Sequence, residues 1–248
     1  MTEPNFFEVH SRFFQTSSVG AWPMRLALRH EAIIESNRTI LEGAHVLDLA
    51  SHDGRWTFAA LNAGAAHVTG VEVREHLIEA ARANMEAYAI DSASYTFLQD
   101  DLNHKTKAPV RCDVALCLGY FYHTLNHLAL MEYLASTSAR HLILDGAVEP
   151  GDEDIIRIYA EDSARDANGA TEAGVHEGRV LVGYPTVKVL SLMLKHFGYK
   201  AAVYDWSSLI AARGVTADHN KPPSADNPVG DYARKARATI VAERVDGP

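Results

Sequence analysis

The segment His45-Val-Leu-Asp-Leu-Ala-Ser-His-Asp-Gly-Arg-Trp-Thr57 decides the fold, because it joins an apolar strand to a tight turn and the start of a helix. Its apolar residues around Asp48 suit a strand that is buried on both faces. The small residues Ala50, Ser51 and Gly54 keep the turn slim, so that its backbone can approach a ligand. A nucleotide-like ligand is therefore expected over this turn.

A second short strand is predicted at His67–Glu72, and it ends in a carboxylate. The spacing from Asp48 to Glu72 is close to the roughly 20 residues that separate the first turn and the acid of a nucleotide-binding βαβ unit. In such a unit the acid lies beside the ribose hydroxyls of an adenosine. Glu72 is therefore expected to bind a ribose.

The chain continues as alternating strands and helices, which predicts a parallel sheet with helices on both faces. Further strands are predicted at Ser94–Gln99, Cys112–Leu118, His141–Asp145, Lys200–Trp206 and Ala236–Val245. Helices are predicted at Arg55–Gly64, Glu75–Tyr88, Leu125–Ser136 and Val187–Phe197.

Two segments depart from this alternation. Residues 147–184 form an insertion after the fifth strand; it is expected to shape a substrate pocket, with Ile155–Tyr159 as a strand over the sheet edge. Residues 1–40 are rich in aromatics and contain a helical run from Pro23 to Asn37, so they are expected to form a helical cap. Residues 41–248 are then a single domain.

Composition limits the partners and the compartment. A formal net charge of -9 disfavours nucleic acid as a partner, since nucleic-acid binders usually carry a basic face. Cys112 and Cys117 lie an odd number of positions apart in one predicted strand, which points them to opposite faces and predicts no disulfide. The chain shows no signal-peptide pattern and no apolar run of roughly 20 residues, so we expect a soluble cytoplasmic protein without membrane contact.

The order of these motifs resembles class I S-adenosylmethionine-dependent methyltransferases from about His45 to the end of the chain. The first motif of that family is an acid followed by alternating glycines, and here two of its three glycines are replaced, by Ala50 and His52. The resemblance implies a Rossmann-like sheet of seven mostly parallel strands, the last antiparallel, with S-adenosylmethionine as cofactor. It also implies that Glu72 holds the ribose and that Asp101, or its neighbour Asp100, lies by the adenine amino group. The implied cofactor-binding residues are Asp48, Ala50, Ser51, His52, Gly54, Glu72, Asp100, Asp101 and Leu118.

A narrower resemblance follows the fourth strand. Leu118-Gly-Tyr-Phe-Tyr-His123 is similar to a Gly-x-x-Tyr-His segment of one branch, which includes small-molecule O-methyltransferases and the tRNA wobble-uridine carboxymethyl transferase. The acidic charge and the short N-terminal region argue against tRNA. The segments Gly178–Thr186 and Phe197–Tyr199 resemble bacterial natural-product and sugar methyltransferases, among them the sugar 1-O-methyltransferases of mycobacterial methylmannose polysaccharide synthesis.

The expected chemistry is methyl transfer to a hydroxyl, for which a protein must position the acceptor oxygen and remove its proton. His123 lies just past the fourth strand and is the predicted general base, although it could instead cap the next helix. Asp145, at the end of the fifth strand, is a second candidate base or a ligand for Mg²⁺. The residues expected to contact the acceptor are Tyr122, Glu149 and Tyr184.

The leading interpretation is therefore an O-methyltransferase that acts on a small molecule, most simply a sugar, with a homodimer as one possible assembly. Two alternatives stay open. An RNA-modifying methyltransferase would need a basic surface around the pocket. A regulatory protein that binds the cofactor without catalysis is conceivable because the glycine motif is degenerate.

Overall fold

The predicted strands form one seven-stranded sheet in the computed structural model, which describes residues 4–16, 22–102, 109–163 and 175–245. The strand order is β3-β2-β1-β4-β5-β9-β8, and β9 runs antiparallel to both of its neighbours. The other pairs are parallel, which confirms the predicted Rossmann-like fold. The strands are β1 (His45–Leu49), β2 (His67–Glu72), β3 (Tyr95–Gln99), β4 (Val114–Leu118), β5 (His141–Ala147), β8 (Tyr199–Val203) and β9 (Arg237–Arg244).

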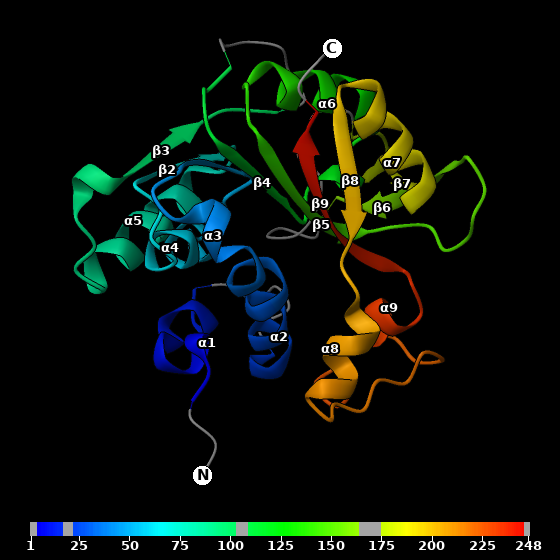
Figure 1. The fold of residues 1–248 in the computed structure, drawn as a ribbon, viewed down its shortest axis with the longest axis horizontal. Helices are drawn as coiled ribbons and strands as arrows, with labels where there is room; N and C mark the ends of the chain where they lie inside the picture. Colours follow the sequence, from blue (N-terminus) through cyan, green and yellow to red (C-terminus); the bar gives the residue numbers. More distant parts are fainter. Residues whose placement is uncertain (1–3, 17–21, 103–108, 164–174, 246–248) are drawn as a thin grey trace.

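Helices cover the sheet and its lower edge (Figure 1). The α-helices are α1 (Phe6–Val9), α2 (Pro23–Ile33), α3 (Arg38–Leu41), α4 (Arg55–Asn62), α5 (Glu75–Ala87), α6 (His127–Ser136), α7 (Val187–His196), α8 (Trp206–Ala212) and α9 (Gly230–Ala233). The 3₁₀ turns are η1 (Ser11–Phe14), η2 (Glu35–Asn37), η3 (Ser92–Ser94) and η4 (Phe121–His123).

The central strands are buried on both faces, and their side chains alternate between two cores. In β4, for example, Leu116 belongs to the core under α4 and α5, whereas Cys117 belongs to the core under α6 and α7. The same alternation separates Val46 from Leu47 in β1. This double burial explains why these segments read as continuous apolar runs.

The two cysteines are free and buried, as expected, but the predicted reason is wrong. β4 begins at Val114, so Cys112 precedes the strand and the odd spacing no longer sets its direction. Both sulfur-bearing side chains lie in the same core, the one beneath α6 and α7. Burial raises the pKa of both thiols, which keeps them protonated.

The insertion forms a separate two-stranded sheet. β6 (Ile156–Asp162) pairs antiparallel with β7 (Arg179–Pro185), so a strand is present where one was predicted, at Ile155–Tyr159, and it belongs to this smaller sheet. The hairpin packs against η4, which brings it to the carboxyl end of β4. Residues 164–174 of the insertion lie outside the described residues.

The N-terminal elements pack onto the domain through buried aromatics and a polar network. Phe7 and Phe13 are fully buried in the core under α4 and α5. Thr16 donates a hydrogen bond to Asp53 (2.8 Å), in the turn after β1, and Asn84 of α5 donates one to the Asp53 carbonyl (2.9 Å). In Figure 1, α1 and α2 lie below the sheet, at the same edge as α8 and α9. The N-terminal segment therefore braces the turn that was predicted to hold the cofactor.

His30 of α2 makes folding of this region sensitive to pH. Its ring stacks on Phe6 (centroids 4.1 Å apart), and burial lowers the pKa of His30 from 6.5 to about 4, against a weaker opposing effect of Glu35. Below pH 6.5 His30 binds a proton in the unfolded chain but stays neutral in the folded chain. The free energy of unfolding therefore falls as the pH drops from about 6.5 to about 4. We expect His30 to contribute about 2 to 3 kcal/mol of this loss.

Urea denaturation at pH 7 and at pH 4.5, for the wild type and for His30→Phe, measures this contribution. The variant should lose less stability between the two pH values, because every other titrating group is common to both proteins. Equal losses would show that His30 is readily protonated in the folded protein.

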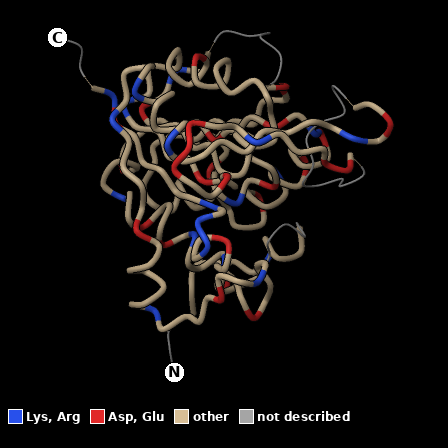
Figure 2. The backbone as a smooth tube through the Cα atoms, turned by 90° about the vertical axis from the view of Figure 1, so that its right-hand side faces the viewer, with Lys and Arg blue, Asp and Glu red and all other residues tan. Residues whose placement is uncertain are grey.

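Charges of both signs are interspersed along the described backbone, without a single basic band in the view of Figure 2. Among the described residues, no helix is both long enough and apolar enough to cross a membrane.

Candidate functional site

The turn after β1 has the backbone conformation that alternating glycines favour. Ala50, His52 and Gly54 all adopt left-handed backbone angles, with φ of 53°, 55° and 78°. This conformation costs roughly 1 to 2 kcal/mol for a residue with a Cβ atom. Ala50 and His52 therefore keep the shape of the glycine motif at an energetic cost, and the replacement of two glycines does not unwind the turn.

Packing against α5 restricts the position of Gly54 to glycine. A Cβ atom built on Gly54 would lie 3.0 Å from side-chain carbons of both Ala81 and Met85 on α5. Asp48 is likewise internal: it is 1% exposed and accepts a hydrogen bond from Thr57 (2.8 Å). Burial raises the pKa of Asp48 to about 7. Both residues shape the turn from inside the protein.

Glu72 has the position and the free capacity expected of a ribose ligand. It ends β2, is 3% exposed, and its Oε1 accepts the N–H groups of Val73 and Arg74 (both 3.0 Å). Its Oε2 accepts the N–H of His52 (3.1 Å). A carboxylate offers about four lone-pair sites, so these three hydrogen bonds leave room for one hydroxyl donor.

The surroundings of Glu72 also fit an adenosine. The hydroxyl oxygen of Ser51 is buried and has no hydrogen-bond partner within the described parts of the chain. Asp100 and Asp101 follow β3, next to β2, and both are partly exposed. Leu118 ends β4 beside β1, and a Cβ atom on the following Gly119 would meet no heavy atom closer than 4.0 Å. The residues present thus fit the cofactor that the motif implies.

A second cluster lies at the carboxyl end of β4, where the hairpin meets η4. The rings of His123 and Tyr122 are in contact, tilted by 40° with centroids 4.2 Å apart, and Tyr184 packs edge-on against Tyr122 at 5.4 Å. Nδ1 of His123 lies 3.4 Å from Oε2 of Glu161, a residue of β6. Three predicted residues thus come together, and Glu161 joins them without having been predicted.

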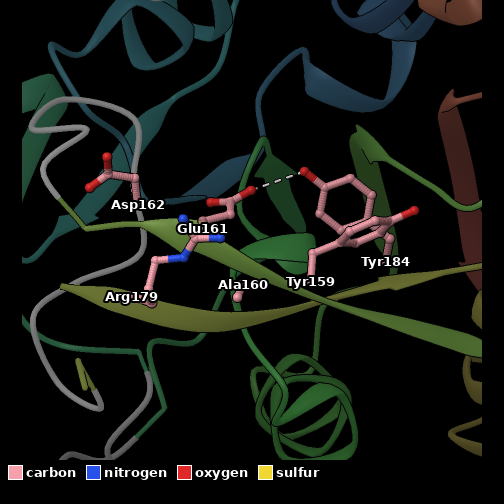
Figure 3. Close-up of a pocket in the computed structure, with 6 residues that line it drawn as sticks. All are labelled: Tyr159, Ala160, Glu161, Asp162, Arg179 and Tyr184. Atoms are coloured by element: carbon pink, nitrogen blue, oxygen red, sulfur yellow. Dashed lines mark hydrogen bonds between the residues drawn. The ribbon is translucent and has the colours of Figure 1, made fainter. Parts of the chain in front are cut away.

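A pocket opens on the hairpin beside this cluster. It has a volume of about 360 Å³, and Figure 3 shows that aromatic, acidic and basic side chains share its lining. The hydroxyl of Tyr184 donates a hydrogen bond to Oε1 of Glu161 (3.0 Å), drawn as a dashed line. The lining residues are Tyr159, Ala160, Glu161, Asp162, Arg179 and Tyr184.

Glu149 contacts Tyr159, one of the residues that line the pocket. Its carboxylate accepts hydrogen bonds from Tyr159 (2.9 Å) and Arg157 (2.7 Å). Tyr159 in turn packs edge-on against Tyr184, with centroids 4.8 Å apart. Glu149 was predicted to bind the acceptor, and its described contacts show how it orients Tyr159.

Asp145 lies at the centre of a buried ionic network. Its Oδ1 accepts hydrogen bonds from Arg29 (2.8 Å) and Arg237 (2.7 Å), and its Oδ2 accepts them from Tyr232 (2.7 Å) and Thr239 (2.6 Å). Burial raises the pKa of Asp145, but the two guanidinium charges outweigh it and hold that pKa well below its usual range. With both oxygens engaged, the contacts argue against the predicted roles of base and Mg²⁺ ligand.

No group of three or more His, Cys, Asp or Glu side chains in the described ranges is arranged to hold a metal ion. The network does reach the second cluster, because the guanidinium of Arg237 lies 5.9 Å from the ring centroid of Tyr122. Sequence reasoning missed Arg29, Arg237 and Glu161. Of these three, only Glu161 has a signal in the sequence. It follows Arg157 and Tyr159 at intervals of two positions, the spacing of residues that share one face of a strand.

Comparisons with known proteins agree with this geometry. Residues 46–142 match the family model described as a methyltransferase domain. No curated protein matches the chain in sequence. The matching residues extend from β1 into β5 and include the turn after β1, Glu72 and His123.

Solved structures share the fold at low sequence identity. The N-terminal domain of EvdMO1, in the presence of SAH and D-fucose, is 18% identical with a TM-score of 0.60 (86% of this chain, 81% of that chain). An S-adenosylmethionine-dependent methyltransferase from Mesorhizobium loti is 17% identical with a TM-score of 0.57 (92% and 99%). The 1,6-didemethyltoxoflavin-N1-methyltransferase of Burkholderia thailandensis, with bound 1,6-didemethyltoxoflavin and S-adenosylhomocysteine, is 16% identical with a TM-score of 0.59 (99% and 92%).

Sequence match and sheet order lead to the same conclusion. Residues 46–142 match the methyltransferase-domain model, and the described chain has the Rossmann-like fold, with the strand order β3-β2-β1-β4-β5-β9-β8, that it shares with these solved methyltransferase structures.

Proposed function

We propose that this protein is an S-adenosylmethionine-dependent O-methyltransferase that acts on a hydroxyl of a small molecule, and that the acceptor is a sugar. The observation that carries the proposal is the position of His123, which adjoins an open pocket through Glu161 and Tyr184. An imidazole, the side chain that most often serves as a general base in enzymes, is thereby placed next to a space that an acceptor can enter.

The reaction requires that the acceptor hydroxyl be positioned and that its proton be removed. When bound, the cofactor supplies a sulfonium methyl group: the bond from the acceptor oxygen to this carbon forms as the carbon–sulfur bond breaks, and that electron pair passes to sulfur. Nε2 of His123 accepts the hydroxyl proton. Tyr122 and Tyr184 hold the acceptor between the histidine and the hairpin, and exclude water from the reacting oxygen.

The lining of the pocket favours a sugar. Tyr159 and Tyr184 offer aromatic faces to the apolar side of a pyranose ring, while Glu161, Asp162 and Arg179 offer hydrogen-bonding groups to its hydroxyls. The presence of D-fucose with the fold relative EvdMO1 supports this substrate class. An anomeric hydroxyl, as in a 1-O-methylation, would be easier to deprotonate than an ordinary alcohol.

Methyl transfer by the purified protein tests this proposal. S-adenosylmethionine is incubated with a panel of mono- and disaccharides, with matched 1-deoxy sugars, and with small amines and phenols, each with and without Mg²⁺ so that metal dependence cannot hide activity. We expect S-adenosylhomocysteine to accumulate together with a mass increase of one methyl group on a sugar. Transfer only to an amine, to a phenol or to RNA would refute the sugar assignment, and absence of transfer despite tight cofactor binding would favour the regulatory alternative.

A further inference from the structure

We propose that Glu161 is a positioning residue for His123: its carboxylate keeps the proton of the neutral imidazole on Nδ1 and so leaves Nε2 as the nitrogen that takes the acceptor proton. This inference rests on the proposed function of His123. It assigns the inserted hairpin a part in catalysis in addition to shaping the pocket.

The first support is the geometry around Nδ1. That nitrogen is buried, lies 3.4 Å from Oε2 of Glu161, and has no hydrogen-bond partner with regular geometry in the part of the chain that the structure describes. The two side chains are only 15% and 12% exposed, so water competes little for the contact. A small rotation of the ring closes the gap to a hydrogen bond, as catalytic contacts commonly tighten when substrate binds.

The second support is the chemistry of the partner. An ionised carboxylate only accepts hydrogen bonds, so the ring nitrogen that faces it must carry the proton. Tyr184 donates to Oε1 of Glu161, and the other carboxylate oxygen, Oε2, is the one that lies 3.4 Å from Nδ1 of the histidine. Burial and the neighbouring Glu161 raise the pKa of Tyr184, which keeps its hydroxyl protonated and donating.

The third support is the anchoring of β6. Glu161 lies opposite Val180, and Tyr159 lies opposite Val182; both valines are buried, at 6% and 0% exposure. The inward face of the hairpin is therefore held against the domain. When His123 accepts the acceptor proton, both ring nitrogens become donors, and the nearby carboxylate stabilises the resulting positive charge.

The test combines spectroscopy with kinetics on the full-length protein. Long-range ¹H–¹⁵N spectra of ¹⁵N-histidine-labelled protein report which ring nitrogen of His123 carries the proton, and the His123→Ala variant identifies its signals. We expect the Nδ1–H tautomer in the wild type and a shift toward Nε2–H in Glu161→Ala. Glu161→Gln retains a neutral acceptor oxygen, so it should fall between the two.

In steady-state kinetics with the best acceptor of the panel, Glu161→Ala should lower kcat by about 10- to 100-fold, the order of loss that a displaced catalytic group causes. The affinity for S-adenosylmethionine should stay unchanged, and KM for the acceptor should change less than kcat. Glu177→Gln, which neutralises an exposed carboxylate in the turn before β7, is the matched control and should keep both the tautomer and kcat.

The outcomes separate the two proposals. An unaltered tautomer and a kcat within twofold of wild type in Glu161→Ala, with His123→Ala still inactive, would overturn the role of Glu161 and leave the proposed function standing. Full activity of His123→Ala would overturn the proposed function and this inference with it. A rise in KM alone would show that Glu161 only binds the acceptor, which also contradicts the inference.

Discussion

Asp145→Asn should lower the free energy of unfolding at pH 7 by about 3 to 5 kcal/mol, the usual cost of removing one partner of a buried ion pair. The side chain is fully buried, and it is the acceptor for two arginines, Arg29 and Arg237, that are themselves about nine-tenths buried. Neutralising it leaves their charges without compensation in a region of low dielectric. Asparagine also turns one acceptor oxygen into a donor that would face another donor.

Urea denaturation at pH 7 measures this loss. Because the folded pKa of Asp145 is depressed, its contribution is fully present above the ordinary pKa of 3.8 and disappears only as the pH falls through the folded value. Glu243→Gln is the control, since it removes an exposed partner of Arg140 and should cost less than about 1 kcal/mol. A loss of under about 1 kcal/mol for Asp145→Asn would mean that the two arginines are solvated or paired elsewhere.

His123→Ala should reduce kcat by about 10²- to 10⁴-fold, the range that general-base catalysis contributes. Removing the imidazole takes away the proton acceptor, while the turn after β1 and Glu72 are untouched. The affinity for S-adenosylmethionine should therefore stay within about twofold of wild type. The side chain is partly exposed, so the fold should tolerate its loss.

The measurement is the rate of S-adenosylhomocysteine release at saturating acceptor, together with the dissociation constant of the cofactor. His219→Ala, which removes an exposed histidine from the loop after α8, is the matched control and should keep full activity. Loss of cofactor affinity in parallel with kcat would instead indicate that His123 supports the cofactor site.

The sheet could be predicted because its signals are local. Burial on both faces gives apolar runs, and helices between strands show their own periodicity, so strand order follows from general rules of connection. The left-handed backbone at Ala50 and His52 matches the motif positions even though the glycines are gone. The backbone angles of the turn therefore follow the glycine motif at two positions where the residue is not glycine.

The site was less predictable because its contacts join distant segments. Arg29 and Arg237 stand 116 and 92 positions from Asp145, so no spacing rule pairs them with it. The contact between His123 and Glu161 depends on where the hairpin docks, which the sequence alone does not specify. The same limit applies to Asp145. The sequence places a carboxylate at the end of a strand, but it does not show whether that carboxylate contacts solvent or two guanidinium groups.

The separate hairpin of β6 and β7 has an evolutionary and engineering consequence. Its backbone hydrogen bonds are made within the pair rather than with the seven-stranded sheet. Exposed residues of the hairpin can therefore diverge, or be exchanged for those of a relative, without breaking a backbone hydrogen bond of the seven-stranded sheet. Under the proposed function, acceptor choice and the stability of the large sheet are then encoded in separate stretches of the chain, and the hairpin is the place to introduce changes that redirect methyl transfer to a new substrate.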